Sequence, residues 1–396
     1  LKKKTIYRLK QMKTIKKSII KKTAKETKKP VTTDSKQEKI VKQDFQFIST
    51  PAELTKCCKE LSKVKKFAID IECENGLHHY GTYVCLIQIS TKTQHYIIDP
   101  LKFKTRKELL PLIKILEDEN IQKILHDYSF DLRIIYSQYN SRPKNIFDTQ
   151  MACLLIGREK LGLASLLEEF CSIKAEKKFQ RYDWTRRPLA DNMLAYAIGD
   201  TNNLIFIQEK LIKELKDKKR LEWCKEENKE IENKKLSYNE QTFYDIKGIR
   251  QLSNNERAIL LRLWRLRDSI AKNNDKPLHY VLGTKMMMEL VKDPPKGDKG
   301  WKYLKGASRY IKSDPKQFSE AVKKAKNEEI MVAPKPRMRM TSEQKKAYEK
   351  LEEKRNKIAE KLKIRAHLIA SNDQLLDITL TKKKDSLRAW QKKLLE

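Results

Sequence analysis

The chain has 396 residues, and its 87 Lys and Arg outweigh 53 Asp and Glu to give a formal net charge of +34. Charge of this sign and size predicts an anionic partner, and 39% hydrophobic residues exclude a wholly disordered basic protein. No run approaches the roughly 18 apolar residues of a membrane span, and seven cysteines without a CxxC pair argue against a disulfide framework and a thiolate zinc site. We therefore expect a cytoplasmic protein that does not bind membranes.

Positive charge is concentrated at both ends of the chain. Residues 1–43 contain 16 basic and 3 acidic side chains, and residues 292–396 contain 29 basic and 15 acidic ones. The stretch between them keeps a net charge of only +7. We expect residues 1–43 to form a basic, flexible arm that is either solvated or in contact with phosphates.

Strand patterns come first along the chain. Short apolar runs bounded by turn residues predict strands over 67–72, 83–90 and 95–98. The elements predicted next are a helix over 106–119, a strand over 122–126, a helix over 129–138, helices after residue 148 and a helix over 189–214. This alternation indicates a mixed α/β layer fold, which we place over residues 44–215.

Strand patterns end near residue 250, and helical patterns continue alone. Residues 254–272 predict a helix with an apolar stripe, Pro334 and Pro336 mark a joint, and a further helical region begins near residue 341. We expect a linker helix region over 216–249 and two small helical domains over 250–330 and 331–396.

Two acidic residues occupy one face of the first long strand. Alternation along the strand places Phe67, Ile69 and Ile71 on one face and Asp70 with Glu72 on the other. Two carboxylates at this spacing can share a cation, but the pair alone is weak evidence, because this spacing is common by chance and a solvent-facing strand edge would explain it.

Asp200 interrupts the apolar stripe of the helix predicted over 189–214. A carboxylate that faces a core is costly unless it is paired or bound to a metal. Tyr196 lies one turn earlier, close enough for both side chains to enter one pocket. Asp131 begins another predicted helix next to apolar residues, where an interaction with the helix dipole is the alternative explanation.

The four carboxylates are not accompanied by a histidine or cysteine cluster, so they suit Mg²⁺ or Mn²⁺ rather than zinc. In a highly basic protein this combination suggests hydrolysis of phosphodiesters with two metal ions.

The chain resembles ribonuclease D, a member of the DEDD exonuclease superfamily in its tyrosine-containing subgroup. The first family motif is matched by Asp70-Ile71-Glu72, the second by residues 124–132 with Asp131 as its acid, and the third by residues 196–200. A further family-like stretch covers residues 181–189, and the resemblance extends over about 45–215.

Residues 264–282 are similar to the helicase-and-RNase-D C-terminal (HRDC) domain, a small nucleic-acid-binding module, and residues 368–376 and 387–391 resemble the end of a second copy. Two copies are typical of bacterial ribonuclease D, whereas one copy fits the eukaryotic nuclear relatives that act with the RNA exosome. A lysine insertion at 382–384 and the basic arm depart from the bacterial pattern.

The resemblance implies a ribonuclease H-like mixed-sheet exonuclease domain that releases nucleoside 5′-monophosphates from the 3′ ends of RNA, such as tRNA precursors and other structured RNA. It also implies that Asp70, Glu72, Asp131 and Asp200 bind two divalent metal ions, Mg²⁺ or Mn²⁺, and that Tyr196 orients the attacking water.

Other interpretations remain open at this point. They are an exosome-type nuclear exonuclease, a DNA proofreading-type exonuclease, and an RNA-binding protein with an inactive exonuclease fold. An inactive fold is expected to lack one of the acids, and all four are present. For His126 and Asp148, which match positions that the family favours, we expect packing and helix capping rather than catalysis.

Overall fold

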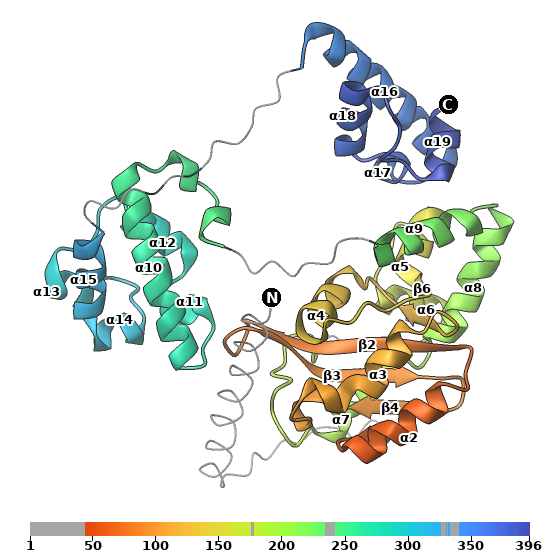
Figure 1. Cartoon of the computed structure of the whole chain (residues 1–396), viewed down its shortest axis with the longest axis horizontal. Helices are drawn as coiled ribbons and strands as arrows, with labels where there is room; N and C mark the ends of the chain where they lie inside the picture. The colour runs from red at the N-terminus through yellow and green to blue at the C-terminus, as the bar shows by residue number, and fades with distance from the viewer. Residues whose placement is uncertain (1–43, 176–177, 234–241, 326–329, 331, 333–339) are drawn as a thin grey trace. The chain divides into compact units, whose positions relative to one another are not determined.

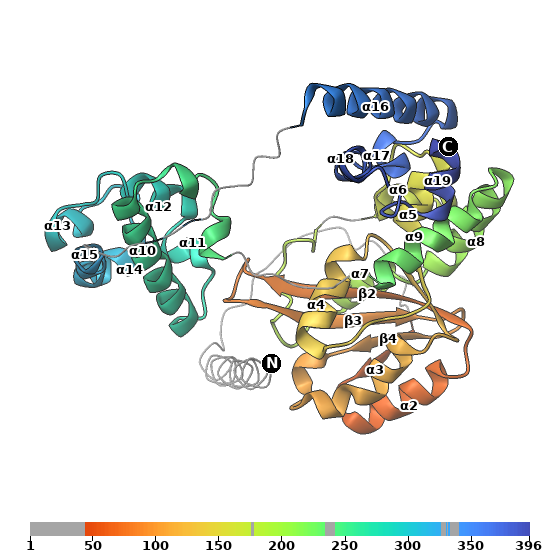
Figure 2. The same ribbon diagram turned by 45° about the horizontal axis from the view of Figure 1, so that its top comes forward.

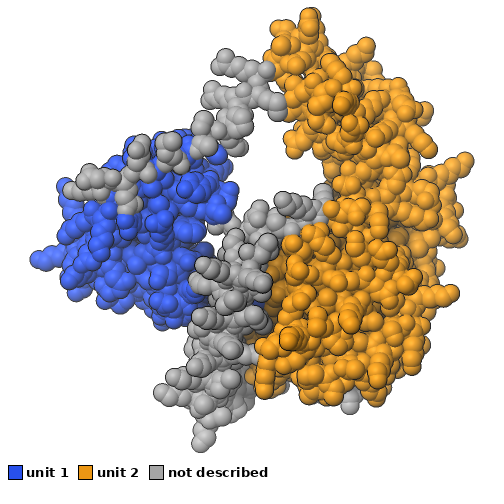
Figure 3. All heavy atoms as spheres, in the orientation of Figure 1, with its two compact units in different colours: residues 1–40, 74–83, 239–336 blue, residues 41–73, 84–238, 337–396 orange. Residues whose placement is uncertain are grey.

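The computed structural model describes residues 44–175, 178–233, 242–325, 330, 332 and 340–396 (Figure 1). These residues form two compact units (Figure 3). The described residues of the larger unit lie within 44–73, 84–233 and 340–396, and those of the smaller unit are 74–83 and all the described residues from 242 to 332. None of the helices described is both long and apolar enough to cross a membrane.

A six-stranded mixed sheet forms the centre of the larger unit within the described residues. Its strands are β1 (Gln46–Ile48), β2 (Lys66–Asn75), β3 (Thr82–Ser90), β4 (His95–Ile98), β5 (Gln122–Leu125) and β6 (Ile146–Asp148). They lie in the order β1-β4-β3-β2-β5-β6, with β4 antiparallel to β3 and with β1 parallel to β4, β2 to β5 and β5 to β6. The predicted α/β class is confirmed, and the short edge strands β1 and β6 were not predicted.

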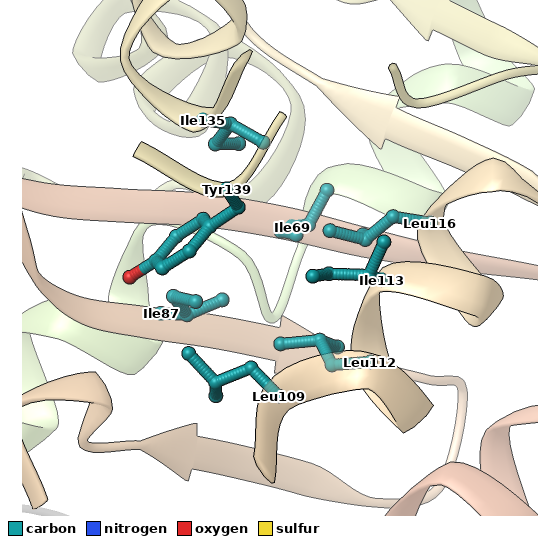
Figure 4. Close-up of a pocket in the computed structure, with 8 residues that line it drawn as sticks. All are labelled: Ile69, Ile87, Leu109, Leu112, Ile113, Leu116, Ile135 and Tyr139. Carbon is teal, nitrogen blue, oxygen red and sulfur yellow. The ribbon is translucent and has the colours of Figure 1, made fainter. Parts of the chain in front are cut away.

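One face of the sheet is covered by α2 (Pro51–Leu61), α3 (Leu110–Glu117) and α4 (Ser129–Tyr139). Phe67, Ile69 and Ile71 of β2 point into this layer, as their alternation predicted. Figure 4 shows Ile69 among side chains of α3 and α4, around a void of about 10 Å³. A void of this size holds at most one water, so this face of the sheet is a packed core.

The opposite face is covered by α5 (Thr149–Ile156), α6 (Leu163–Cys171) and α8 (Leu204–Asp217). Ala68, Ile124 and Phe147 contribute the sheet side of this second core. Because neighbouring residues of β2 alternate between the two faces, Asp70 and Glu72 lie on the same face as Ala68.

The helix α9 (Leu221–Asn233) covers the outer edge of the sheet. A carboxylate oxygen of Glu232 accepts the backbone N–H of Ile146 at 2.9 Å, and the amide oxygen of Asn228 accepts that of Asp148 at 3.3 Å. An uncovered edge strand exposes unpaired backbone groups to other chains. Part of the segment expected as a linker is therefore a structural cover for β6.

The helix predicted over 189–214 is two helices, α7 (Asp191–Gly199) and α8. Asp200 is the C-cap residue that immediately follows α7. The hydroxyl of Thr201 bonds the hydroxyl of Ser90 on β3 at 2.7 Å, which ties the interruption to the sheet. The prediction of one continuous helix was wrong, because the chain turns between α7 and α8, where this tertiary hydrogen bond lies.

Two helical segments repeat one arrangement. In the first, α10 (Asn254–Asn273), α11 (Leu278–Val281) and α12 (Thr284–Leu290) follow one another, and each begins 88 residues before its counterpart. The counterparts are α16 (Ser342–Leu362), α17 (Ala366–Ile369) and α18 (Asn372–Thr381), shown in Figure 2. The first segment continues with α13 (Gly297–Lys302), α14 (Arg309–Ser313) and α15 (Pro315–Lys324), and the second with α19 (Ala389–Leu395). Short 3₁₀ helices lie at Pro100–Lys102, Arg106–Leu109, Phe243–Asp245 and Ile249–Gln251.

Each of the two segments contains a buried arginine that makes equivalent hydrogen bonds. Arg267 donates to a carbonyl 15 residues later at 3.5 Å and to a side-chain oxygen 17 residues later at 3.1 Å. Arg355 donates to groups at the same two spacings, at 3.2 and 2.7 Å. Each arginine thereby fixes the turn between the second and third helices of its segment.

The second helical segment is attached to the sheet domain through α9. The ring of Trp390 stacks on that of Trp223 with centroids 4.6 Å apart, and its indole N–H donates to Glu227 at 3.1 Å. Arg220 donates to the carbonyl of Leu362 at 2.7 Å. This segment therefore shares the second core with α5, α8 and α9.

Candidate active site

The strand β2 supplies two of the predicted site residues. Asp70 and Glu72 are half-buried and lie on the sheet face opposite Ile69 and Ile71. Their carboxylate oxygens and that of Asp200 lie within 4.8 Å of one another. Residues 130 positions apart in the sequence thus form one acidic cluster.

Tyr196 is half-buried one turn before Asp200 on α7. Burial raises the pKa of its phenol, and the negative charges of Asp200, Glu72 and Asp70 raise that pKa further. The hydroxyl consequently keeps its proton at neutral pH and remains both a donor and an acceptor.

Asp131 lies in the first turn of α4. Asp131 is outside the tight group of three carboxylates. Its negative charge nevertheless raises the pKa of Glu72, and the negative charge of Asp70 raises the pKa of Asp131. The loop before α4 is held by Asp148, which accepts the backbone N–H of Asp127 at 3.0 Å. Asp127 has a left-handed backbone with φ of 54°, so this hydrogen bond stabilises an uncommon conformation just before the helix.

Asp148 and His126 have the supporting roles expected of them. Asp148 caps α5 by accepting the backbone N–H of Gln150 at 2.8 Å. The Nδ1 of His126 lies 2.9 Å from the hydroxyl of Thr149, and burial lowers the imidazole pKa to about 4. A histidine that stays neutral in this position packs the loop and carries no charge into the site.

The four carboxylates have strongly perturbed acidities. Burial raises the pKa of Asp70 to about 7, and burial with the charge of Asp70 raises that of Asp200 to about 8. Burial and mutual repulsion hold the pKa values of Glu72 and Asp131 well above their ordinary range. Among the described residues, no positively charged side chain acts to lower any of these four pKa values.

These acids therefore fit divalent cations. Like charges this close cannot all ionise unless a cation joins them, and hard carboxylate oxygens are the ligands that Mg²⁺ and Mn²⁺ prefer. The cluster itself is thus the observation that favours a metal site.

An aromatic wall supports Tyr196. Its ring centroid lies 5.5 Å from that of Phe179 and 6.1 Å from that of Trp184, and Tyr182 packs edge-on against both of these neighbours. Trp184 is 3% exposed, so this wall is part of the interior. Sequence reasoning noted residues 181–189 only as a family-like stretch and assigned them no role.

Arg187 holds this wall in place. Its guanidinium donates to both carboxylate oxygens of Asp99, to the carbonyls of Trp184 and Arg186, and to the carbonyl of Cys85 on β3. Asp99 follows β4 and is completely buried. Nothing in the sequence near Asp99 signalled this partnership, because the two residues meet only in the folded chain.

Family models match two parts of the chain: a 3′-5′ exonuclease domain over residues 45–216 and an HRDC domain over residues 256–309. Ribonuclease D of Zymomonas mobilis is 32% identical over 270 residues, which cover 66% of this chain and 67% of that protein.

Other relatives share a smaller part of their length. Protein RRP6-like 2 of Arabidopsis thaliana is 30% identical over 266 residues, and human exosome complex component 10 is 29% identical over 267 residues. These matches cover 63% and 64% of this chain but only 30% of each relative.

Solved structures share the architecture. Escherichia coli RNase D, described as an exoribonuclease involved in structured RNA processing, matches with a TM-score of 0.68 and 25% identity over 89% of this chain and 96% of that one. A protein from Bifidobacterium adolescentis matches with a TM-score of 0.72 and 21% identity over 88% of this chain and 94% of that one. The predicted order of a mixed-sheet exonuclease domain followed by a helical region is confirmed.

Proposed function

The chain belongs to the ribonuclease D family, and on that basis we propose that it is a 3′-5′ exoribonuclease that releases nucleoside 5′-monophosphates from structured RNA such as tRNA precursors. The observation that carries this proposal is the convergence of Asp70, Glu72 and Asp200 within 4.8 Å, beside Asp131 and Tyr196. Recruitment of RNA is supported by the net charge of +34. A cytoplasmic location is part of the same proposal and is supported by seven free cysteines.

Asp70, Glu72, Asp131 and Asp200 would hold two divalent ions, Mg²⁺ or Mn²⁺. When bound, such ions supply Lewis-acid stabilisation of the charge that develops on the scissile phosphate and help to ionise the attacking water. The carboxylates contribute their negative charges, which are costly without a cation and therefore favour its binding.

Tyr196 would position the nucleophile and would not act as a base. Its raised pKa keeps the hydroxyl protonated, so it can form one hydrogen bond to a water and one to a phosphate oxygen. The ring contacts with Phe179 and Trp184 restrict its rotamer. A water held in one orientation reacts faster because its entropy is lost before the chemical step.

Hydrolysis of a 3′-labelled RNA in Mg²⁺ or Mn²⁺ tests the proposal. We expect release of labelled mononucleotide by the parent and no measurable release by Asp200→Asn. Asp191→Asn is the matched control, because Asp191 is an exposed carboxylate on the same helix, and we expect it to leave the rate unchanged. Equal activity of parent and Asp200→Asn would contradict the assignment.

A matched DNA oligonucleotide in the same assay distinguishes the proofreading-type alternative. Faster hydrolysis of DNA than of RNA would favour it, and the absence of any hydrolysis would favour the inactive, RNA-binding alternative. The exosome-type alternative is favoured by the relatedness to exosome complex component 10. Against it stands the second helical segment, since two copies are typical of bacterial ribonuclease D.

A further inference from the structure

A chain of polar side chains lies directly beside Asp200. The hydroxyl of Thr201 is 2.7 Å from the hydroxyl of Ser90, and the Nδ1 of His95 is 2.8 Å from that same Ser90 hydroxyl. Ser90 and Thr201 are completely buried, and His95 is half-buried. A buried hydroxyl without a partner is costly, so these contacts fix the positions of the groups that make them.

One direction of donation satisfies every contact in this chain. The Thr201 hydroxyl donates to the carbonyl of Ile198 at 3.3 Å. A hydroxyl has a single proton, so Ser90 is then the donor to Thr201 and accepts from the Nδ1–H of His95. Burial lowers the pKa of His95, which keeps its imidazole neutral near neutral pH. The chain of hydrogen bonds therefore adds no charge next to the acidic cluster.

Asp200 occupies a position where the helix itself gives little support. It is the C-cap residue immediately after α7, where the backbone hydrogen bonds of the helix end. Gly199, the last residue of α7, has no side chain that could pack against the sheet. Thr201 is the next residue after Asp200, so a fixed Thr201 side chain restricts the backbone from which the Asp200 carboxylate projects.

Ser90 connects this turn to the part of the sheet that carries the other acids. It is the last residue of β3, which lies beside β2 (Figure 1). The side chain of Ile89 belongs to the core under α2, α3 and α4, so alternation places Ser90 on the opposite face. That face also carries Asp70 and Glu72. The hydrogen bond between Ser90 and Thr201 therefore joins the turn of Asp200 to the sheet face of its two partner acids.

We propose that Thr201 and Ser90 are positioning residues, which hold Asp200 where its carboxylate can share divalent cations with Asp70 and Glu72. The proposal rests on the exoribonuclease assignment for its metal site, and it adds two residues that act through Asp200. Loss of a residue that orients a metal ligand typically lowers metal affinity or activity by about 10- to 100-fold. A role in fold stability alone would lower the Tm and leave the metal affinity of the folded protein unchanged.

Isosteric variants of the full-length protein separate these two roles. Thr201→Val removes the hydroxyl and keeps the shape of the side chain, whereas Thr201→Ser keeps the hydroxyl. Thr379→Val is the matched control, because Thr379 is 1% exposed and its hydroxyl donates to the carbonyl of Leu375 within α18 at 2.8 Å.

Calorimetry measures Mn²⁺ affinity at a temperature at which unfolding curves show every variant to be folded. We expect Thr201→Val to bind Mn²⁺ more weakly by on the order of tenfold. Thr201→Ser and Thr379→Val should bind it as the parent does. With a defined RNA we expect kcat of Thr201→Val to fall and KM to stay nearly unchanged, because the RNA contacts are not altered.

Ser90→Ala tests whether the two hydroxyls act through one hydrogen bond. We expect it to weaken Mn²⁺ binding in the same direction as Thr201→Val. The double variant should bind Mn²⁺ no more weakly than Thr201→Val alone, because the shared hydrogen bond is lost only once. If Thr201→Val does not fold, Ser90→Ala makes the same comparison with the parent and the control.

Four results would overturn the proposal. They are parent-like Mn²⁺ affinity in both Thr201→Val and Ser90→Ala, equal losses in Thr201→Val and Thr379→Val, Mn²⁺ binding by Thr201→Ser as weak as that by Thr201→Val, and additive losses in the double variant. None of them changes the hydrolysis of RNA by the parent or its loss in Asp200→Asn. Failure of this proposal is therefore distinguishable from failure of the exoribonuclease assignment.

Discussion

Arg187 binds both carboxylate oxygens of Asp99, at 2.6 and 2.8 Å, and the carboxylate is completely buried. The same guanidinium donates to the carbonyl of Trp184 at 2.8 Å, and the ring of Trp184 lies against that of Tyr196. A buried ion pair outside the acidic cluster is thereby connected to the tyrosine of the candidate site through one aromatic residue.

Asp99→Asn is expected to lower the rate of hydrolysis and the stability together. Loss of one partner of a buried pair costs about 3–5 kcal/mol, and the freed Arg187 no longer holds Trp184 against Tyr196. We expect single-turnover hydrolysis to slow by roughly tenfold or more while Mn²⁺ affinity, measured by calorimetry, stays unchanged. Glu209→Gln, which breaks exposed pairs with Lys66 and Lys92, is the control and should cost less than about 1 kcal/mol. An unchanged single-turnover rate in Asp99→Asn would separate the ion pair from Tyr196.

Tyr196→Phe removes the hydroxyl and keeps the ring contacts with Phe179 and Trp184. We expect kcat to fall by about 10²-fold or more with KM and Mn²⁺ affinity nearly unchanged, because only the orientation of the nucleophile is lost. Steady-state kinetics on a defined RNA provide the measurement. Tyr136→Phe is the control, since Tyr136 is a half-buried tyrosine of α4 whose ring contacts Arg142. Full activity of Tyr196→Phe would show that the hydroxyl has no role.

Metal binding is expected to stabilise the protein more at pH 8 than at pH 6. The folded pKa values of Asp70 and Asp200, about 7 and about 8, exceed their ordinary value of 3.8. Protonation of these two carboxyl groups therefore stabilises the folded state. This stabilisation is complete below about pH 4 and is lost as the pH rises through 7 to 8. Protons also compete with the cation for the same oxygens.

Thermal unfolding with Mg²⁺ or with EDTA at each pH measures this effect. We expect the increase in Tm caused by Mg²⁺ to be larger at pH 8, and Asp200→Asn to reduce the difference between the two pH values. A Mg²⁺ effect that is larger at pH 6 would show that protons and the cation do not compete.

Trp390→Ala should loosen the second helical segment from α9. The change removes the stack on Trp223 and leaves Glu227, 8% exposed, without its indole donor. Truncation of a buried tryptophan costs about 3–5 kcal/mol, and we expect faster amide hydrogen exchange in both α9 and α19. Lys393→Ala alters an exposed residue of the same helix and should leave exchange unchanged. Faster exchange confined to α19 would contradict attachment through α9.

Removal of residues 1–43, which lie outside the described residues, should weaken RNA binding mainly at low salt. Affinity for single strands falls with a log-log salt slope of about −0.7 per neutralised phosphate, and this segment contains 16 basic side chains. We expect a flatter slope and nearly unchanged turnover at saturating RNA. A large loss of saturated turnover would place the segment in the active site.

Much of the candidate site was visible in local patterns. Alternation along β2 separated Asp70 and Glu72 from the apolar face, because successive strand residues point to opposite sides whatever the rest of the fold does. The strand His95–Ile98 was predicted with the bounds that it has, since its apolar run ends in turn residues. The spacing of Tyr196 and Asp200 likewise follows from one helical turn.

Local patterns could not show where separate segments meet. The helix predicted over 189–214 is interrupted where Thr201 bonds Ser90, a residue 111 positions away. Arg187, which donates to the carbonyl of Trp184, binds Asp99, a residue 88 positions away. The sequence by itself determined the residue types and the faces on which they lie, since periodicity is a property of the backbone. Tertiary structure alone decided which of those faces are covered, because burial depends on contacts between residues that are distant in the chain.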